Sequence, residues 1–193
     1  NYNTVQIGNQ CWTQSNLKVS KYRNGDHIPT GLSDSAWVNN TSGAYVVYNN
    51  DSVNDGLYGK LYNHYSVMDT RGLCPTGWHV PTDGEWTALE NFLGGSSVAG
   101  GALKSTSTQP TPGGWWSPNT GATNSSGFTA FPGGLRYGHA EGFNPGIGSS
   151  GWWWTSSQLG SLAVYRLKGY WYTNIHQNTT SFAAGLSVRC LRD

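Results

Sequence analysis

Residues 74–86 read CPTGWHVPTDGEW, and this stretch contains the clearest helix start in the chain. Thr82 and Glu85 stand at the spacing of a capping box, in which each side chain accepts a hydrogen bond from a free backbone N–H group of the first turn. The glycine pair 94–95 ends the pattern that follows. We therefore predict a helix over 83–93. Its apolar face comprises Trp86, Leu89 and Leu93, with Phe92 alongside.

Outward from this helix, the chain divides into a mixed first half and a β-rich second half. Gly8-Asn9 is a hairpin signal, and 61–69 carries a second helical period. No helical period follows Lys104. The expected strands are 4–7, 10–12, 45–48, 152–155, 163–167, 170–175 and 186–191, with a further pair flanking Asn24-Gly25 and a polar loop over 49–56. This order predicts an α+β fold in a single domain, 1–193.

The composition excludes several classes of protein. Only 11% of the 193 residues are charged, against about 25% in average globular proteins. Aromatic residues make up 13%, including ten Trp, which argues against disorder and against a coiled coil. No apolar stretch is long enough to span a bilayer, and a net charge of +1 argues against a nucleic-acid partner. The surface is therefore expected to be polar but uncharged, as paratopes and sugar-binding faces are.

Three cysteines, Cys11, Cys74 and Cys190, allow one internal disulfide, and their spacing leaves all three pairings open. Low charge and abundant Ser, Thr and Trp favour an extracellular setting, where a disulfide persists. The chain opens at Asn1 without a recognisable signal peptide, as a processed or trimmed fragment would.

Local motifs for catalysis and metal binding are weak. Residues 146–151 match G-x-G-x-x-G, but they lack the flanking strand and helix of a dinucleotide site, so we interpret them as a turn. His79 is expected to be packed and hydrogen-bonded. Residues 51–56 offer oxygen ligands to Ca²⁺ without EF-hand spacing, so a solvated loop is favoured over a calcium site. Glu141 is the only acid in 91–192, which leaves a glycosidase carboxylate pair little choice of partner.

Trp152-Trp153-Trp154 marks a strand whose side chains alternate between two faces. Trp152 and Trp154 point one way and Trp153 points the other way, and one of the two faces packs in the core. We expect the face with Trp153 to offer a flat aromatic platform to a ligand. The alternative is a structural role for all three rings.

Several long segments resemble a known family. They comprise 7–12 with Asn16-Leu17, 59–63, 74–86, 126–134, 151–157 and 187–190. Together they are similar to the Fibrobacter succinogenes major paralogous domain, which is common in surface and secreted bacterial proteins. The resemblance covers nearly the whole chain. That family in turn resembles the formylglycine-generating-enzyme branch of the C-type lectin fold.

The resemblance implies a C-type-lectin-like fold: a twisted antiparallel sheet flanked by two helices, with the terminal strands together and long loops in a β-rich C-terminal half. It also implies a disulfide between Cys74 and Cys190, with Cys11 unpaired. The cysteine pair of formylglycine-generating enzymes has no counterpart in 163–184, so oxidase chemistry is not expected. The Glu-Pro-Asn, Gln-Pro-Asp and Trp-Asn-Asp motifs of calcium-dependent lectins do not occur either.

Similar domains serve as variable proteins of diversity-generating retroelements, in which adenine-directed mutagenesis rewrites chosen codons near the 3′ end of a gene. The stretches that match their variable segments are 137–145 and 165–184. The framework-like residues there and nearby are Arg136, Phe143, Arg166, Ile175 and Arg189. The residues expected to contact a ligand are Tyr137, His139, Glu141, Trp153, Leu167, Tyr170, Trp171, Tyr172, Asn174, His176 and Asn178. This pattern suits a rigid scaffold that presents an interchangeable contact surface.

We therefore expect a non-enzymatic ligand-binding module, receptor-like or adhesin-like, that is secreted or displayed on a bacterial or phage surface. We expect a monomer that binds an unknown protein or glycan, with no catalytic residue, metal or cofactor required, no nucleic-acid partner and no direct membrane insertion. Two alternatives belong to other classes. One is an enzyme, either a formylglycine-generating-enzyme relative with altered chemistry or a glycan hydrolase that uses Glu141. The other is a structural cell-surface module.

Overall fold

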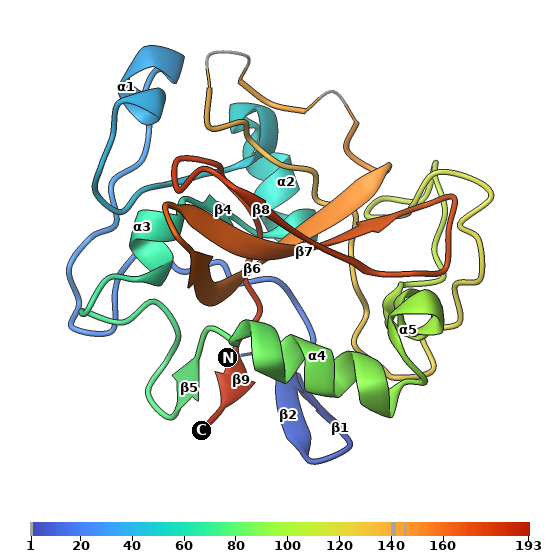
Figure 1. The fold of residues 1–193 in the computed structure, drawn as a ribbon. Helices are drawn as coiled ribbons and strands as arrows, with labels where there is room; N and C mark the ends of the chain where they lie inside the picture. The colour runs from blue at the N-terminus through green and yellow to red at the C-terminus, as the bar shows by residue number, and fades with distance from the viewer. Residues whose placement is uncertain (1, 140–141, 145) are drawn as a thin grey trace.

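The computed structural model describes residues 2–139, 142–144 and 146–193. It has a mixed α+β fold with antiparallel sheets (Figure 1). The helices of the described residues are α1 (Asp34–Val38), α2 (Ser52–Tyr58), α3 (His64–Val67), α4 (Asp83–Phe92), α5 (Ser96–Leu103) and the 3-10 helix η1 (Tyr48–Asn50). The strands are β1 (Thr4–Ile7), β2 (Gln10–Thr13), β3 (Tyr45–Val46), β4 (Leu61–Tyr62), β5 (Trp78–His79), β6 (Ser150–Leu159), β7 (Leu162–Gly169), β8 (His176–Thr180) and β9 (Leu191–Arg192).

The strands form three sheets in the described part of the chain. The first has the order β1-β2-β9-β5, and Trp12 of β2 pairs with Leu191 of β9. The N- and C-terminal strands therefore lie side by side (Figure 1), as the resemblance implies. β3 pairs with β4, and β6, β7 and β8 form the third sheet, which lies beside α4 in Figure 1.

Helix α4 begins where the capping box predicts. Thr82 Oγ1 accepts a hydrogen bond from the Glu85 N–H at 3.2 Å, and Glu85 Oε2 accepts one from the Thr82 N–H at 2.7 Å. Glu85 Oε1 also lies 3.0 Å from His79 Nε2, and His79 Nδ1 lies 2.7 Å from Asp193 Oδ1. His79 is therefore hydrogen-bonded as expected, although its side chain is 36% exposed rather than packed away.

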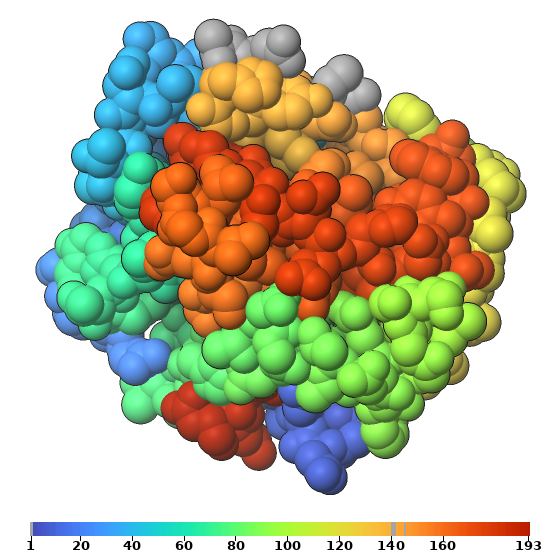
Figure 2. Space-filling model, in the orientation of Figure 1, coloured from blue at the N-terminus to red at the C-terminus, as the bar shows by residue number. Residues whose placement is uncertain are grey.

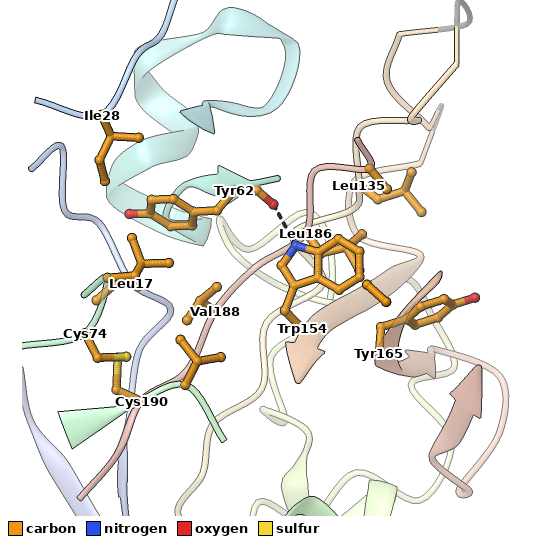
Figure 3. Packing of buried hydrophobic residues seen from close by; sticks show 14 of the residues in the cluster. Leu17, Ile28, Tyr62, Cys74, Leu135, Trp154, Tyr165, Leu186, Val188 and Cys190 are labelled. Atoms are coloured by element: carbon orange, nitrogen blue, oxygen red, sulfur yellow. Dashed lines mark hydrogen bonds between the residues drawn. A yellow bond between two sulfur atoms is a disulfide. The ribbon is translucent and has the colours of Figure 1, made fainter. Parts of the chain in front are cut away.

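The buried apolar residues form two main clusters, one around Trp154 and one around Trp12, Trp86 and Trp153. In the first, Trp154 Nε1 donates a hydrogen bond to the Tyr62 carbonyl at 2.7 Å (Figure 3). A buried indole N–H usually finds such a partner. The first cluster therefore holds β6 against β4.

A disulfide joins Cys74, before β5, to Cys190, before β9 (Figure 3), and Cys11 is free. Both observations confirm what the resemblance implies. The bridge spans a sequence separation of 116 residues. A loop of that size restricts the unfolded chain enough to stabilise the fold by about 4–5 kcal/mol in the chain-entropy account.

Several predicted elements agree with the structure. The hairpin at Gly8-Asn9 forms β1 and β2, and the strands predicted over 152–155 and 163–167 lie within β6 and β7. The strand pair at Asn24-Gly25 reduces to one isolated bridge. The run 186–191 forms isolated bridges before β9 begins.

Other segments differ from the prediction. The stretch 49–56 is not a loop, because η1 and α2 occupy it and Asp51 caps α2 by accepting from the Val53 N–H at 3.0 Å. The helix predicted over 61–69 is β4 followed by the short α3. Turns replace the strand predicted over 170–175. The sequence pattern also missed α1 and α5, since helices of 5 and 8 residues are shorter than the window of about 11–18 residues in which a helical period can be recognised.

Candidate functional site

One face of the β6–β7–β8 sheet packs on α4. Side chains alternate along each strand, so the cross-strand partners Trp153, Arg166 and Gln177 share this inner face. The Arg166 guanidinium bonds Asp83 Oδ1 and Glu90 Oε1 of α4, each at 2.5 Å. Arg166 is only 1% exposed, so the sheet is fixed to α4 by a buried charged cluster.

The prediction of Trp153 as a ligand platform is wrong. Trp153 is 1% exposed, and its Nε1 donates a hydrogen bond to Asn16 Oδ1 at 2.9 Å. Its ring lies 6.4 Å from that of Trp86 and 6.5 Å from that of Phe128. Strand alternation gave the two faces correctly, but the apolar side of α4 covers the face with Trp153. The partly exposed tryptophan of the three is Trp152.

The outer face of the same sheet carries three of the predicted contact residues, Leu167, His176 and Asn178. Trp152, Leu167 and His176 are cross-strand partners there, one from each strand. Tyr165 and Asn178 form the next pair on this face. His176 and Asn178 are exposed, whereas Leu167 is half-buried.

The outer face continues into the loop after β7. Gly169, which faces outward with Tyr165 and Leu167, leaves room for the Tyr172 ring: a Cβ at Gly169 would lie 2.6 Å from a Tyr172 ring carbon. The Tyr172 ring lies 5.0 Å from the His176 ring. The predicted loop residues and the sheet residues therefore form one surface.

A series of edge-on ring contacts runs along this surface. Ring centroids are separated by 5.7 Å from Trp116 to Tyr170, by 4.8 Å from Tyr170 to Trp171 and by 5.1 Å from Trp171 to Tyr172. Trp171 is 56% exposed and Trp116 is 41% exposed. In Figure 2 strands β6, β7 and β8 and this loop, coloured orange to red, occupy much of the visible face above α4 and α5.

Two lysine ammonium groups hold the loop 170–174 through its main chain. Lys104 Nζ donates hydrogen bonds to the carbonyls of Tyr170 at 3.3 Å and Tyr172 at 3.4 Å. Lys168 Nζ donates to the Tyr172 carbonyl and to the Asn174 carbonyl, the latter at 2.9 Å. Because these acceptors are main-chain carbonyls, the hydrogen bonds do not depend directly on which side chains the loop carries, although Lys168 Nζ also lies 4.6 Å from the centre of the Tyr172 ring.

Neighbouring backbone completes this support. The Thr120 N–H donates to the Tyr170 carbonyl at 2.7 Å, and the Gly101 N–H donates to the Thr173 carbonyl at 3.1 Å. Figure 1 accordingly shows the segment after β7 running beside α5 and the loop that follows α5. The loop is thus fixed on several sides by main-chain contacts.

Burial sets the charge of the two lysines. It lowers the pKa of Lys104 to about 8 and the pKa of Lys168 to about 7, where the nearby Lys104 charge adds to the effect. Both the ammonium and the neutral amine carry N–H groups, so the hydrogen bonds to the loop persist across this titration.

The other predicted stretch meets the outer face at a pocket of about 380 Å³. Tyr137 and His139 stack on one another with centroids 4.8 Å apart, and both line the pocket. Trp152 and Tyr165 of the sheet, 5.1 Å apart, line it as well. Tyr137 and His139 therefore belong to the same surface as Leu167 and His176.

The framework-like residues are separated from the contact residues by burial. Arg136, Arg166 and Arg189 are at most 2% exposed, and Ile175 is 4% exposed. The Arg189 guanidinium fixes the scaffold through main-chain carbonyls, and no carboxylate of the described residues pairs with it. The carbonyls belong to Thr13, Phe128 and Thr129. Phe143 is half-buried.

A family model for the Fibrobacter succinogenes major domain matches residues 5–192. The chain belongs to this family. No curated protein and no solved structure matches the chain closely enough to show a relationship. Within the described residues, no helix of this Fibrobacter succinogenes major domain has the length and apolar character needed to cross a membrane.

The carboxylates considered for a metal have other partners in this Fibrobacter succinogenes major domain. Asp51 caps α2, and Asp55 forms an ion pair with Lys60 at 2.5 Å. The described residues contain no group of three or more His, Cys, Asp or Glu that could hold a metal ion. Glu141, a predicted contact residue, lies outside the described residues. The G-x-G-x-x-G stretch forms a turn at 147–149, as predicted.

Sequence reasoning missed five residues that build this surface. Lys104 and Lys168 support the loop, and Trp116, Trp152 and Tyr165 supply rings. Strand alternation was a usable signal for Trp152 and Tyr165. The support by Lys104 had no local signal, because it joins α5 to a loop about 65 residues further along the chain.

Proposed function

We propose that this Fibrobacter succinogenes major domain is a non-enzymatic ligand-binding module of C-type-lectin-like fold, related to the formylglycine-generating-enzyme branch. We further propose that a diversity-generating retroelement varies its C-terminal recognition face. The observation that carries the proposal is the separation of roles in 165–178. Exposed or half-exposed side chains are interspersed there with buried residues such as Arg166 and Ile175, and two lysines hold the loop by hydrogen bonds to its carbonyls.

Such a surface tolerates exchange of its side chains. Substituting Trp171 or Asn174 alters what the surface contacts, while the main-chain hydrogen bonds to Lys104 and Lys168 stay in place. Exposed aromatic rings supply contact area at low entropic cost, and His and Asn supply directed hydrogen bonds. The proposed ligand is a protein or glycan.

We propose a secreted or surface-displayed location on a bacterium or phage. The Cys74–Cys190 disulfide supports it, because disulfides persist in oxidising compartments.

Binding is tested on glycan and protein arrays probed with the purified domain, followed by affinity measurements on the partner found. We expect the double variant Tyr172→Ala/His176→Ala to bind at least tenfold more weakly. Leu159→Ala is the matched control, since Leu159 is 69% exposed at the β6–β7 turn, outside this surface. A featureless array, or an unchanged affinity of the double variant, contradicts the proposal.

Diversification is tested by sequencing the native locus. We expect a near-copy of the segment encoding 128–193 that differs from the gene only where the copy has adenines. Such differences are expected at the codons of exposed residues such as Trp171 and His176, and not at those of Arg166 or Arg189. A locus without this copy overturns diversification, whereas the array experiment still decides on binding.

A further inference from the structure

The pocket on the outer face has walls of two kinds. One ring pair, Trp152 and Tyr165, comes from the sheet, and the other, Tyr137 and His139, comes from the segment after Arg136. Side chains of Leu135, Ala184 and Leu186 complete the apolar lining. With about 380 Å³, the pocket falls in the size range of small-ligand sites.

The chemistry of the lining selects an uncharged group. No Asp, Glu, Lys or Arg side chain occurs among the described residues that line the pocket. Its polar side-chain atoms include the hydroxyls of Thr180, Ser181 and the two tyrosines. A charged group would lose hydration here without meeting an Asp, Glu, Lys or Arg side chain of the described lining, whereas an aromatic ring could pack against the four lining rings.

One hydroxyl in this lining is available to a ligand. The Tyr165 side chain is largely buried, at 6% exposed, but no described residue forms a hydrogen bond with its hydroxyl. Figure 3 shows this hydroxyl directed away from Trp154 and from the disulfide. Burial raises the pKa of Tyr165 above its ordinary value, so the group stays protonated and can both donate and accept. This hydroxyl is not among the buried polar atoms that lack a partner in the described residues, so it still reaches solvent at the pocket, where a ligand atom can replace water as its partner.

We propose that this pocket is an anchor site for one uncharged aromatic side chain, tryptophan or tyrosine, of a protein partner. Both side chains combine a ring for the apolar walls with one N–H or O–H group for the Tyr165 hydroxyl. The proposal rests on the proposed ligand-binding function and names the partner class. It makes the pocket the fixed part of the recognition surface, because five of its lining side chains lie on the sheet or in the core; these are Leu135, Trp152, Tyr165, Ala184 and Leu186.

A glycan fits this pocket less well. Sugar hydroxyls require several directed hydrogen bonds, and sugars commonly stack on one open ring rather than enter an apolar recess. The lining supplies hydroxyls but no carboxylate and no amide side chain among its described residues. The chemistry therefore favours an aromatic side chain.

The first experiment titrates the whole domain with indole, with benzothiophene, which has the shape of indole but no N–H, and with methyl α-glucoside. Binding is followed by NMR chemical-shift changes and by contacts between probe and protein protons. We expect both bicyclic probes to contact Trp152, Tyr165 and Thr180, and the sugar to contact none of them. Aromatic probes that bind only elsewhere, or do not bind at all, overturn the proposal.

Variants then test the geometry. Thr180→Phe places a ring in the pocket from β8 and should weaken indole binding at least tenfold, whereas Gln177→Phe, on the opposite face of the same strand, should not. Tyr165→Phe should weaken indole about fivefold to tenfold and leave benzothiophene unchanged. Unchanged indole binding in Thr180→Phe contradicts the site. If that variant does not fold, the contact map of the unsubstituted domain decides.

A third experiment distinguishes two ligands for the pocket, an aromatic side chain of a protein partner and a free small aromatic molecule. Peptides selected from a random displayed library should contain a Trp or Tyr whose replacement by Ala abolishes binding, and indole should compete with them. If indole binds the pocket but competes with no peptide, the protein partner is overturned. Trp171→Ala should leave indole binding to the pocket unchanged, because Trp171 does not line it. The proposal for the loop and the proposal for the pocket can therefore fail independently.

Discussion

The inner and outer faces of the β6–β7–β8 sheet are built from adjacent residues but differ in how their polar groups are satisfied. On the inner face, Arg166 meets two carboxylates and the Trp153 N–H meets an amide oxygen. On the outer face, Trp171 is largely exposed, and the Tyr165 hydroxyl reaches solvent and bonds no described residue. The inner face packs on α4, whereas the outer face packs into the core around Trp154 and Tyr165 and is open from Leu167 and His176 into the following loop. The difference teaches that only this open part of the outer face is free to vary.

The largest effect is expected from breaking the inner charged cluster. Arg166→Met leaves the carboxylate of Glu90 buried without a cation, so we expect a loss of about 3–5 kcal/mol in the free energy of unfolding. The double variant Arg166→Met/Glu90→Met should recover part of this loss, because no unpaired buried carboxylate remains there. Urea unfolding measures both. A single-variant loss below about 1 kcal/mol would show that the cluster does not hold the sheet to α4.

The neighbouring tryptophans test the two faces with the same substitution. Trp153→Phe removes a fully buried ring edge and the hydrogen bond to Asn16, for an expected loss of about 2 kcal/mol. Trp152→Phe, on the half-exposed side, should cost less than about 1 kcal/mol. Thermal unfolding followed by circular dichroism gives both values. Equal losses in the free energy of unfolding would show that the two faces of β6 contribute equally to stability, contrary to the contrast between the inner and outer faces.

The buried lysines predict a dependence on pH. Unfolded lysine titrates near its ordinary pKa, whereas folded Lys168 titrates at about 7. Between these values the unfolded chain binds more protons, so the contribution of Lys168 to stability rises with pH. From pH 7 to pH 9.5, unfolding free energy should increase by about 1–2 kcal/mol more in the unsubstituted domain than in Lys168→Met. An identical pH profile for the two proteins contradicts the assignment.

The smallest effect on stability is expected at the exposed loop. Trp171→Ser should change the free energy of unfolding by less than about 0.5 kcal/mol, because the side chain is 56% exposed and the loop is held by its carbonyls. The same variant should weaken binding to a partner found on the arrays. A destabilisation above about 1 kcal/mol would show that the loop depends on its side chains.

Local patterns in the sequence predicted much of the fold. The capping box at Thr82 and Glu85 placed α4, and the glycine turn after Ile7 placed the first hairpin. These predictions succeeded because the interactions that stabilise each element lie within a few residues of one another. Strand alternation likewise separated Trp152 from Trp153.

The same local reasoning failed where distant segments decide. It placed a loop at 49–56, where α2 forms, and a strand at 170–175, where contacts from Lys104, Gly101 and Thr120 fix a turn. The contact residues Tyr137, His139 and His176 were chosen by resemblance, and the structure brings them to one surface. No local signal in the sequence showed that Tyr137 and His139 line a pocket with residues of the sheet.

By itself, the sequence determined which residues of a strand share a face of the sheet, where α4 begins, and the low content of charged residues that makes this surface polar and aromatic. These follow from side-chain alternation, backbone capping and composition, which act along the chain. Only the tertiary structure decided which face of the sheet α4 covers, and with it that Trp153 is buried and Trp152 faces the pocket. That choice depends on which apolar surfaces meet across the fold, and burial is a property of the packed molecule rather than of any segment.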